Sequence, residues 1–194
     1  MGHKTTKTMN RKIRLLTLAM LMISSFGWSQ KYFTRNADVK FFSEAPAENI
    51  EAQNRQVTCV LNTENGEIAF SVQMKGFHFE KALMEEHFNE NYVESHKYPK
   101  ATFAGKIMDF NKVDISKNGT YKVKVEGTMT LHGVEKQMDA DGELTIKGEE
   151  IIVSSKFDMK IADYNIAIPN AVVDKIAEVI EVSLDATLTK YTKN

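Results

Sequence analysis

Three evenly spaced histidines are the first residues in this sequence that could carry chemistry. His78, His87 and His96 each offer an imidazole, and three imidazoles can hold a metal ion. The surrounding residues, however, predict a strand end at His78, a helix at His87 and a loop at His96. Because no feature of the sequence brings these segments together, we expect surface or packed histidines and no metal site.

Acidic and thiol side chains are the other candidates for catalysis. Paired carboxylates of the kind that cleave glycosidic bonds could come from the acidic cluster Glu85, Glu86, Glu90 and Glu94. A charged helix face explains this cluster more simply. Cys59, the single cysteine, would need an activating base, and it cannot pair within the chain. We therefore expect no catalytic residue, no cofactor and no enzymatic activity.

The N-terminal segment predicts export from the cytoplasm. Five basic residues precede an apolar run from Leu15 to Ile23, and the small residues Gly27 and Ser29 follow. This pattern is typical of a secretory signal peptide over residues 1–29, with residues 30–194 as one mature domain. The apolar run is too short for an integral membrane span, and no cysteine follows it to carry a lipid anchor. The expected location is the periplasm or the extracellular medium.

The charge balance excludes nucleic acid as a partner. The predicted signal peptide holds five of the 25 basic residues and none of the 26 acidic ones, which leaves 20 against 26, a net charge of −6. Binding to nucleic acid needs a basic face, and docking on anionic membranes by charge needs one too.

Apolar and polar residues alternate along most of the mature chain, which is typical of β-strands with one apolar face. Asn65-Gly66 and Asn118-Gly119 favour tight hairpin turns between such runs, whereas Asp141-Gly142 falls inside a run and indicates a bulge. The pattern predicts eight strands: Tyr32–Ser43, Asn54–Asn62, Glu67–Gly76, Lys100–Asn111, Thr120–Leu131, Lys136–Ile146, Glu150–Ala162 and Val179–Tyr191.

Two segments have helical spacing instead. Apolar residues recur every three to four positions in Phe79–Phe88, and again in Asn170–Glu178 after Pro169. Two short helices added to eight antiparallel strands suit an all-β barrel whose ends are partly closed.

The inward-facing residues decide whether such a barrel is filled or hollow. Glycines within strands could leave space, and flexible methionines suit long apolar ligands, but alternation alone fits a filled interior as well. The candidates for lining a cavity are Val39, Phe41, Phe70, Val72, Met74, Phe103, Ile107, Gly127, Met129, Leu131, Phe157, Met159, Ile161, Val182 and Leu184.

Three local segments resemble a known family. His87–Tyr92, His96–Phe103 and Gly127–Lys136 are similar to segments of the YceI-like family of bacterial, lipocalin-like proteins. The resemblance runs from about Lys31 to Tyr191 in the expected order.

This resemblance implies an eight-stranded lipocalin-like barrel whose apolar cavity binds polyisoprenoid chains, with no catalytic residue. Phe157–Tyr164 stands where many members carry an arginine-containing segment, which leaves the head group of the ligand open. We therefore expect a protein that carries or sequesters an isoprenoid or other long apolar lipid, and a homodimer is compatible with this role. An enzyme acting on a lipid in the same cavity, and a filled barrel that serves as an interaction module, remain as alternatives.

Overall fold

The computed structural model describes residues 31–192. The predicted signal peptide, residues 1–29, lies outside the described residues, so the structure does not bear on it.

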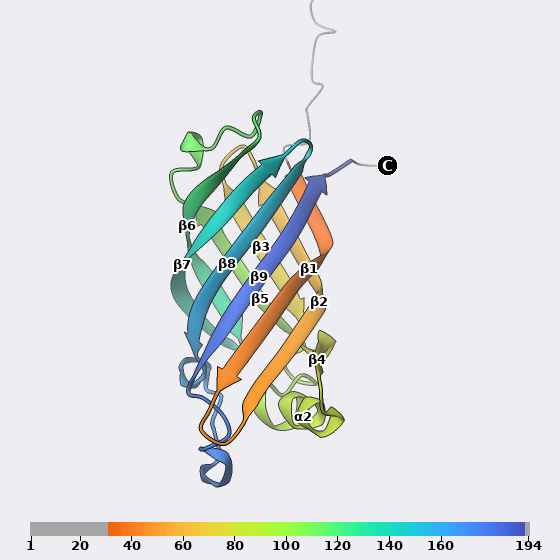
Figure 1. Ribbon diagram of the computed structural model, residues 1–194, viewed down its shortest axis with the longest axis vertical. Helices are drawn as coiled ribbons and strands as arrows, with labels where there is room; N and C mark the ends of the chain where they lie inside the picture. Colours follow the sequence, from red (N-terminus) through yellow and green to blue (C-terminus); the bar gives the residue numbers. More distant parts are fainter. Residues whose placement is uncertain (1–30, 193–194) are drawn as a thin grey trace, which may run out of the picture.

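The described chain forms one antiparallel sheet that closes on itself. The strand order is β1-β9-β8-β7-β6-β5-β3-β2-β4, and β1 also pairs with β2, which closes the barrel (Figure 1). The predicted all-β, eight-stranded antiparallel barrel is therefore confirmed, with one additional short strand. The strands are β1 (Lys31–Glu44), β2 (Asn49–Asn62), β3 (Glu67–Gln73), β4 (Phe77–Phe79), β5 (Lys100–Ile107), β6 (Gly119–Leu131), β7 (Val134–Lys147), β8 (Glu150–Lys160) and β9 (Val179–Lys190).

The additional strand arises because the predicted strand Glu67–Gly76 is interrupted. Strand β3 ends at Gln73, whose carbonyl oxygen accepts a hydrogen bond of 2.7 Å from the buried side-chain amide of Asn54. A Cβ at Gly76 would lie 2.8 Å from the Asn54 Oδ1, so this close approach requires glycine. Beyond a 3₁₀ turn at Met74–Gly76, β4 pairs with β2 at Ala52–Asn54.

Only one of the two predicted helices forms within the described chain. The first is α2 (Ala82–His87), which continues as a π-helical turn, η2 (Phe88–Tyr92). The prediction for Asn170–Glu178 was wrong, because this segment has a single 3₁₀ turn, η5 (Asn170–Val172). Its backbone hydrogen-bonds to the β1–β2 region instead: the Ala47 amide donates to the Asp174 carbonyl, and the Ala177 amide donates to the Ser43 hydroxyl.

No helix in the described range is long and apolar enough to cross a membrane.

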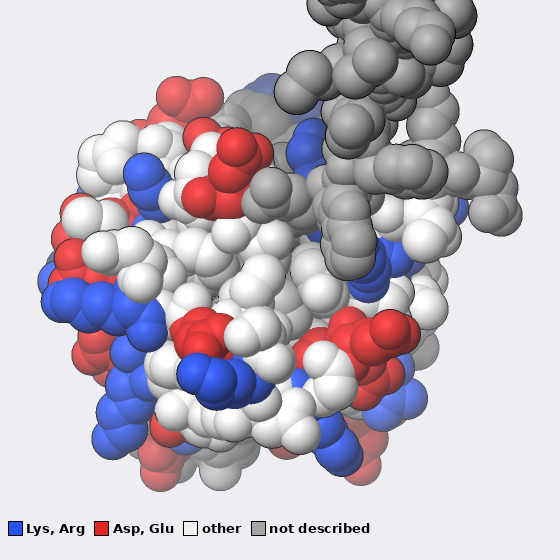
Figure 2. All heavy atoms as spheres, turned by 90° about the horizontal axis from the view of Figure 1, so that it is seen from above, with Lys and Arg blue, Asp and Glu red and all other residues white. Residues whose placement is uncertain are grey.

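Apolar side chains fill the end of the barrel away from α2. Leu61, Ile107, Leu144, Ile151 and Leu188 are all 2% exposed or less, and they come from five different strands. Figure 2 looks onto this end, where acidic and basic side chains are intermixed around the rim. Neither charge forms a continuous patch on the part of this face where the described residues are visible.

The connections between strands differ in part from the predictions. His132 and Gly133 form the two-residue β6–β7 turn with φ of 51° and 74°, as a hairpin of this length requires. The prediction of a hairpin turn at Asn118-Gly119 was wrong, since a longer loop with a 3₁₀ turn at Phe110–Lys112 joins β5 to β6.

The predicted bulge at Asp141-Gly142 was also wrong. Strand β7 pairs with β6 without any register shift from Val134 to Ile146. Its pairing with β8, in contrast, runs from Lys147 only as far as Gly142, which lies opposite Ser155. Gly142 therefore marks the point at which two neighbouring strands part.

Candidate functional site

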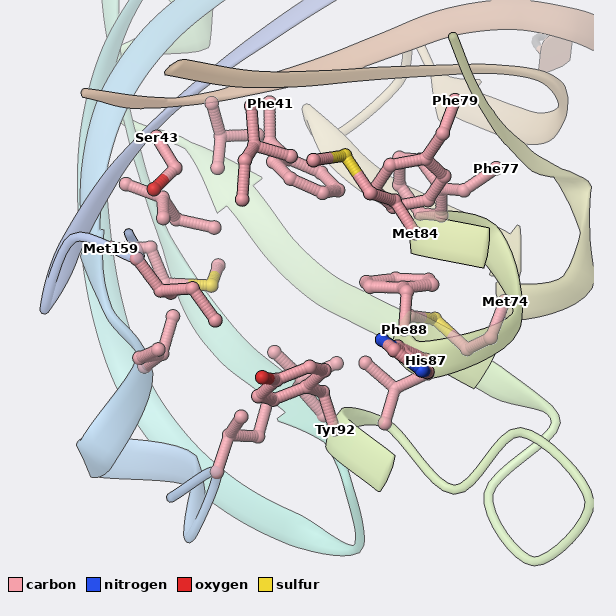
Figure 3. Close-up of a pocket in the computed structure, with 18 of the residues that line it drawn as sticks. Phe41, Ser43, Met74, Phe77, Phe79, Met84, His87, Phe88, Tyr92 and Met159 are labelled. Atoms are coloured by element: carbon pink, nitrogen blue, oxygen red, sulfur yellow. The ribbon is translucent and has the colours of Figure 1, made fainter. Parts of the chain in front are cut away.

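An apolar cavity of about 440 Å³ lies inside the barrel at the end that carries α2 (Figure 3). Its wall comes from β1, β2, β3, β5, β6, β8 and β9, and its lid comes from η1 (Met74–Gly76), β4, α2, η2 and the segment 161–176. The apolar residues that line it are Val39, Phe41, Ile50, Val72, Met74, Phe77, Phe79, Leu83, Met84, Phe88, Val93, Ala101, Met129, Leu131, Met159, Ile161, Ile166, Val172, Ile176, Ile180 and Val182, and Tyr92 lines it with them.

Four phenylalanines form one side of the cavity. The Phe88 ring stacks on Phe41 at a centroid distance of 5.6 Å and meets Phe77 and Phe79 at 5.5 and 5.1 Å. These residues lie on η2, β1 and β4, so the cluster attaches the helical segment to the barrel wall. Figure 3 shows Phe88 below Phe41, Phe77 and Phe79, with Met159 and Ser43 across the cavity from Phe77 and Phe79.

Few polar residues line the cavity, and they are Ser43, Glu48, Lys81, His87, Tyr92 and Lys175. Ser43 is 2% exposed, and its hydroxyl accepts the hydrogen bond from the Ala177 amide at 2.9 Å. Lys81 pairs with Glu48 at 2.6 Å, and the hydrogen bond to this carboxylate raises the pKa of Lys81. Burial raises the pKa of the Tyr92 phenol. This arrangement can enclose an apolar chain.

The residues considered first for chemistry are not brought together. His87 lines the cavity, whereas His78 is exposed and pairs with Glu85 at 3.4 Å. Among residues 31–192 no group of three or more His, Cys, Asp or Glu side chains is placed to hold a metal ion. Cys59 is fully buried in β2, and burial raises the pKa of its thiol, which opposes formation of a thiolate.

A hydrogen-bonded connection beside the cavity was missed by the sequence analysis. His132 Nε2 contacts the Glu94 carboxylate at 2.8 Å, and His132 Nδ1 contacts the Tyr164 carbonyl oxygen at 3.0 Å. The His132 hydrogen bond is the main reason that the pKa of Glu94 lies below its usual value. Glu94, His132 and Asn165 all have left-handed backbone conformations, with φ of 43°, 51° and 57°.

The same connection joins three segments that line the cavity. Val93 precedes Glu94, Leu131 precedes His132, and Ile166 follows Asn165. Left-handed φ values are uncommon for residues other than glycine, and three at one place indicate a backbone that its surroundings hold in position. Sequence analysis could not find this connection, because the two residues that His132 contacts, Tyr164 and Glu94, lie 32 and 38 positions away along the chain.

The structure divides the predicted cavity residues into two groups. Nine of them line the cavity at the α2 end, and six do not. The nine are Val39, Phe41, Val72, Met74, Met129, Leu131, Met159, Ile161 and Val182. Their part in binding a ligand stays a prediction.

The other six are Phe70, Phe103, Ile107, Gly127, Phe157 and Leu184, which lie elsewhere on the inner face. Ile107 belongs to the filled end. The Phe103 ring covers Gly105 and Gly127, which are opposite each other in the β5–β6 register. A Cβ at Gly127 would lie 2.7 Å from Phe103 Cζ. The expectation that glycine leaves hollow space here was therefore wrong.

The lid residues were missing from the predicted cavity residues. Leu83, Met84 and Phe88 line the cavity from α2 and η2. The sequence did indicate an apolar helix face within Phe79–Phe88, and such a face must pack against another apolar surface. Alternation within strands could not show which end of the barrel that stripe covers.

Solved structures of other proteins share the fold of this chain. A polyisoprenoid-binding domain from Saccharophagus degradans superposes with a TM-score of 0.71 at 16% identity, covering 84% of this chain and 99% of that one. Burkholderia cenocepacia BcnA gives 0.64 at 13%, covering 79% and 96%. The Campylobacter jejuni YCEI protein gives 0.60 at 14%, covering 99% and 100%. At these identities the likeness shows the fold.

No curated protein matches the sequence closely enough to support an argument. The family model of the YceI-like domain, in contrast, matches residues 32–188, which is most of the chain. The chain therefore belongs to the YceI-like domain family.

Proposed function

We propose that this protein binds the apolar chain of an isoprenoid or similar lipid inside its barrel, as a carrier or sequestering protein. The observation that carries the proposal is the cavity itself, an apolar interior of about 440 Å³ beneath an aromatic lid. Its volume lies within the range of about 300–1,000 Å³ typical of ligand sites. The name of the Saccharophagus degradans neighbour, a polyisoprenoid-binding domain, supports the same ligand class.

Burial of the ligand chain supplies the free energy of binding. Each Å² of apolar surface that leaves water contributes about 25 cal/mol. Flexible side chains in the lining can adapt to a ligand chain that has no polar groups. They are supplied by Met74, Met84, Met129 and Met159. Binding of this kind needs neither a cofactor nor a catalytic group.

The proposed site of action is outside the cytoplasm. Support comes from the N-terminal sequence, in which basic residues, an apolar run and small residues follow one another as in a signal peptide. A lipid carrier is useful there, because apolar chains must cross an aqueous compartment.

Filling the cavity tests the proposal. Met129 lines the cavity, and Met129→Trp should weaken the binding of radiolabelled farnesol, measured by equilibrium dialysis, by about tenfold or more. Met108→Trp is the matched control, because Met108 is 42% exposed and follows β5 at the opposite end of the barrel. Equal affinity in the two folded variants, or no binding to the wild type, would refute the proposal.

A further inference from the structure

We propose that the cavity has a second opening through the side of the barrel, between β7 and β8, and that the end of a long chain leaves the protein there. This inference rests on the proposed function, because it concerns ligands longer than the cavity.

The strand register shows where the wall parts. Strand β8 pairs with β7 over Glu150–Ser155, and with β9 over Ile151–Lys160. Residues 134–141 of β7 and 156–160 of β8 therefore lie outside the β7–β8 register, although each segment is paired on its other side. These two segments therefore border a gap in the hydrogen-bonded pairing of the barrel wall, and this is where we place the opening.

The inner face is partly exposed along this gap. On β7, Met138 and Ala140 point inward, opposite Gly127 and Val125 of β6, and all four are partly exposed. Phe157 and Leu184 on β8 and β9 are inward-facing and partly exposed as well. Val39, Val57 and Val72, inward-facing residues on β1, β2 and β3, are 9% exposed or less. Phe41, Phe70 and Phe103 on β1, β3 and β5 also face inward and are partly exposed, but along β7 the partial exposure is continuous from Lys136 to Ala140.

A cleft of about 830 Å³ lies at the end of the gap away from the cavity, next to Gly142 and Ser155. It is lined by inward-facing Val123, Gly142, Ser155 and Leu184, together with outward-facing residues of the same four strands. The cleft thus involves both faces of the wall at the point where β7 and β8 part.

Two polar contacts cross the gap and bound it. At the end away from the cavity, the Ser155 hydroxyl donates to the Asp141 carbonyl oxygen at 2.7 Å. At the cavity end, Lys136 pairs with Asp163 at 3.0 Å, with side chains 41% and 47% exposed. Lys136 lies opposite Met129, which lines the cavity, so the strip of partly exposed residues begins at the cavity wall.

The apolar strip between these contacts suits the excess length of a chain. Met138, Ala140 and Phe157 offer apolar contacts without hydrogen-bonding demands, and the chain would cover surface that water now reaches. A short ligand contained in the cavity would not reach this strip. The inference therefore predicts a dependence on chain length.

Blocking the gap tests this prediction. Ala140→Trp places an indole on the inner face at the gap, and Met138→Trp is a second variant in case the first fails to fold. Ala104→Trp is the matched control, since Ala104 is exposed on the outer face of β5. Equilibrium dialysis with farnesol as the short prenol and solanesol as the long one should show solanesol affinity lowered by about tenfold in Ala140→Trp, with farnesol affinity within about twofold of the wild type.

The outcomes separate this inference from the function on which it rests. Wild-type protein that binds neither prenol overturns the proposed function and this inference with it. Wild-type protein that binds both prenols, while folded Ala140→Trp or Met138→Trp retains the solanesol affinity of Ala104→Trp, overturns the side opening alone.

Discussion

At the scale of residues, the pair Gly105 and Gly127 shows how one side chain decides where the barrel is hollow. The two glycines are opposite each other on β5 and β6, and the Phe103 ring lies across both. Because they have no side chains of their own, they let the ring approach the backbone closely. The sequence predicted that Gly127 faces inward, but it could not show that a neighbouring phenylalanine occupies the space.

Substitution at Gly127 should therefore destabilise the fold. A Cβ there would lie 2.5 Å from the Ala104 carbonyl oxygen and from the Gly105 Cα, which are backbone atoms. Gly127→Ala is expected to lower the free energy of unfolding by about 1–3 kcal/mol, measured by urea denaturation. Gly119→Ala, on the same strand, is the control, because its Cβ would approach nothing closer than 3.7 Å. Equal stability of the two variants would contradict this packing.

The Glu94–His132 contact predicts a dependence of stability on pH. The pKa of Glu94 is lower in the folded protein than its ordinary value, mainly through the hydrogen bond with His132. Its contribution to stability is therefore present above the unfolded pKa and is lost as the pH falls through the folded pKa. Glu94→Gln should melt below the wild type at neutral pH, and the two melting temperatures should converge in acid.

Thermal unfolding followed by circular dichroism between about pH 7 and about pH 3 measures this convergence. Glu86→Gln is the control, since Glu86 is exposed on α2. A constant difference between Glu94→Gln and the wild type across this range would show that the carboxylate charge does not stabilise the connection.

At the scale of elements, alternation predicted the strands well and their ends less well. Apolar and polar residues alternate from Glu67 to Gly76, yet β3 ends at Gln73. The reason is a hydrogen bond from the side-chain amide of Asn54, which is distant in sequence, to the Gln73 carbonyl oxygen. The glycine of Asp141-Gly142 does mark an irregularity in the sheet, but the irregularity is the end of the β7–β8 pairing and not a bulge. A glycine within a strand can mark a bulge or a change of neighbour, and only the register of β8 distinguishes the two.

The helical lid should depend on Phe88. This residue contacts Phe41, Phe77 and Phe79, so Phe88→Ala would remove all of these ring contacts and enlarge the cavity. The free energy of unfolding should fall by about 2–4 kcal/mol, measured by denaturant titration. Leu83→Ala is the control from the same lid, because Leu83 is 60% exposed and should matter little. A loss at Phe88 no larger than at Leu83 would mean that the aromatic cluster does not anchor the lid.

At the scale of the whole molecule, closure of the sheet and the position of the cavity follow from different kinds of information. Eight alternating runs suffice to predict an antiparallel barrel, because a sheet of that size removes its edges by closing. The filled end and the hollow end have similar patterns along the strands. What separates them is the lid, whose contacts join β1, β4 and η2 across long stretches of sequence.

Native mass spectrometry of the protein purified from its own cells, without added lipid, tests the central claim most directly. An apolar cavity that holds an isoprenoid predicts a complex whose extra mass belongs to a hydrophobic molecule that organic solvent extracts. Recovery of the empty protein alone, which then fails to take up added farnesol or solanesol, would contradict it.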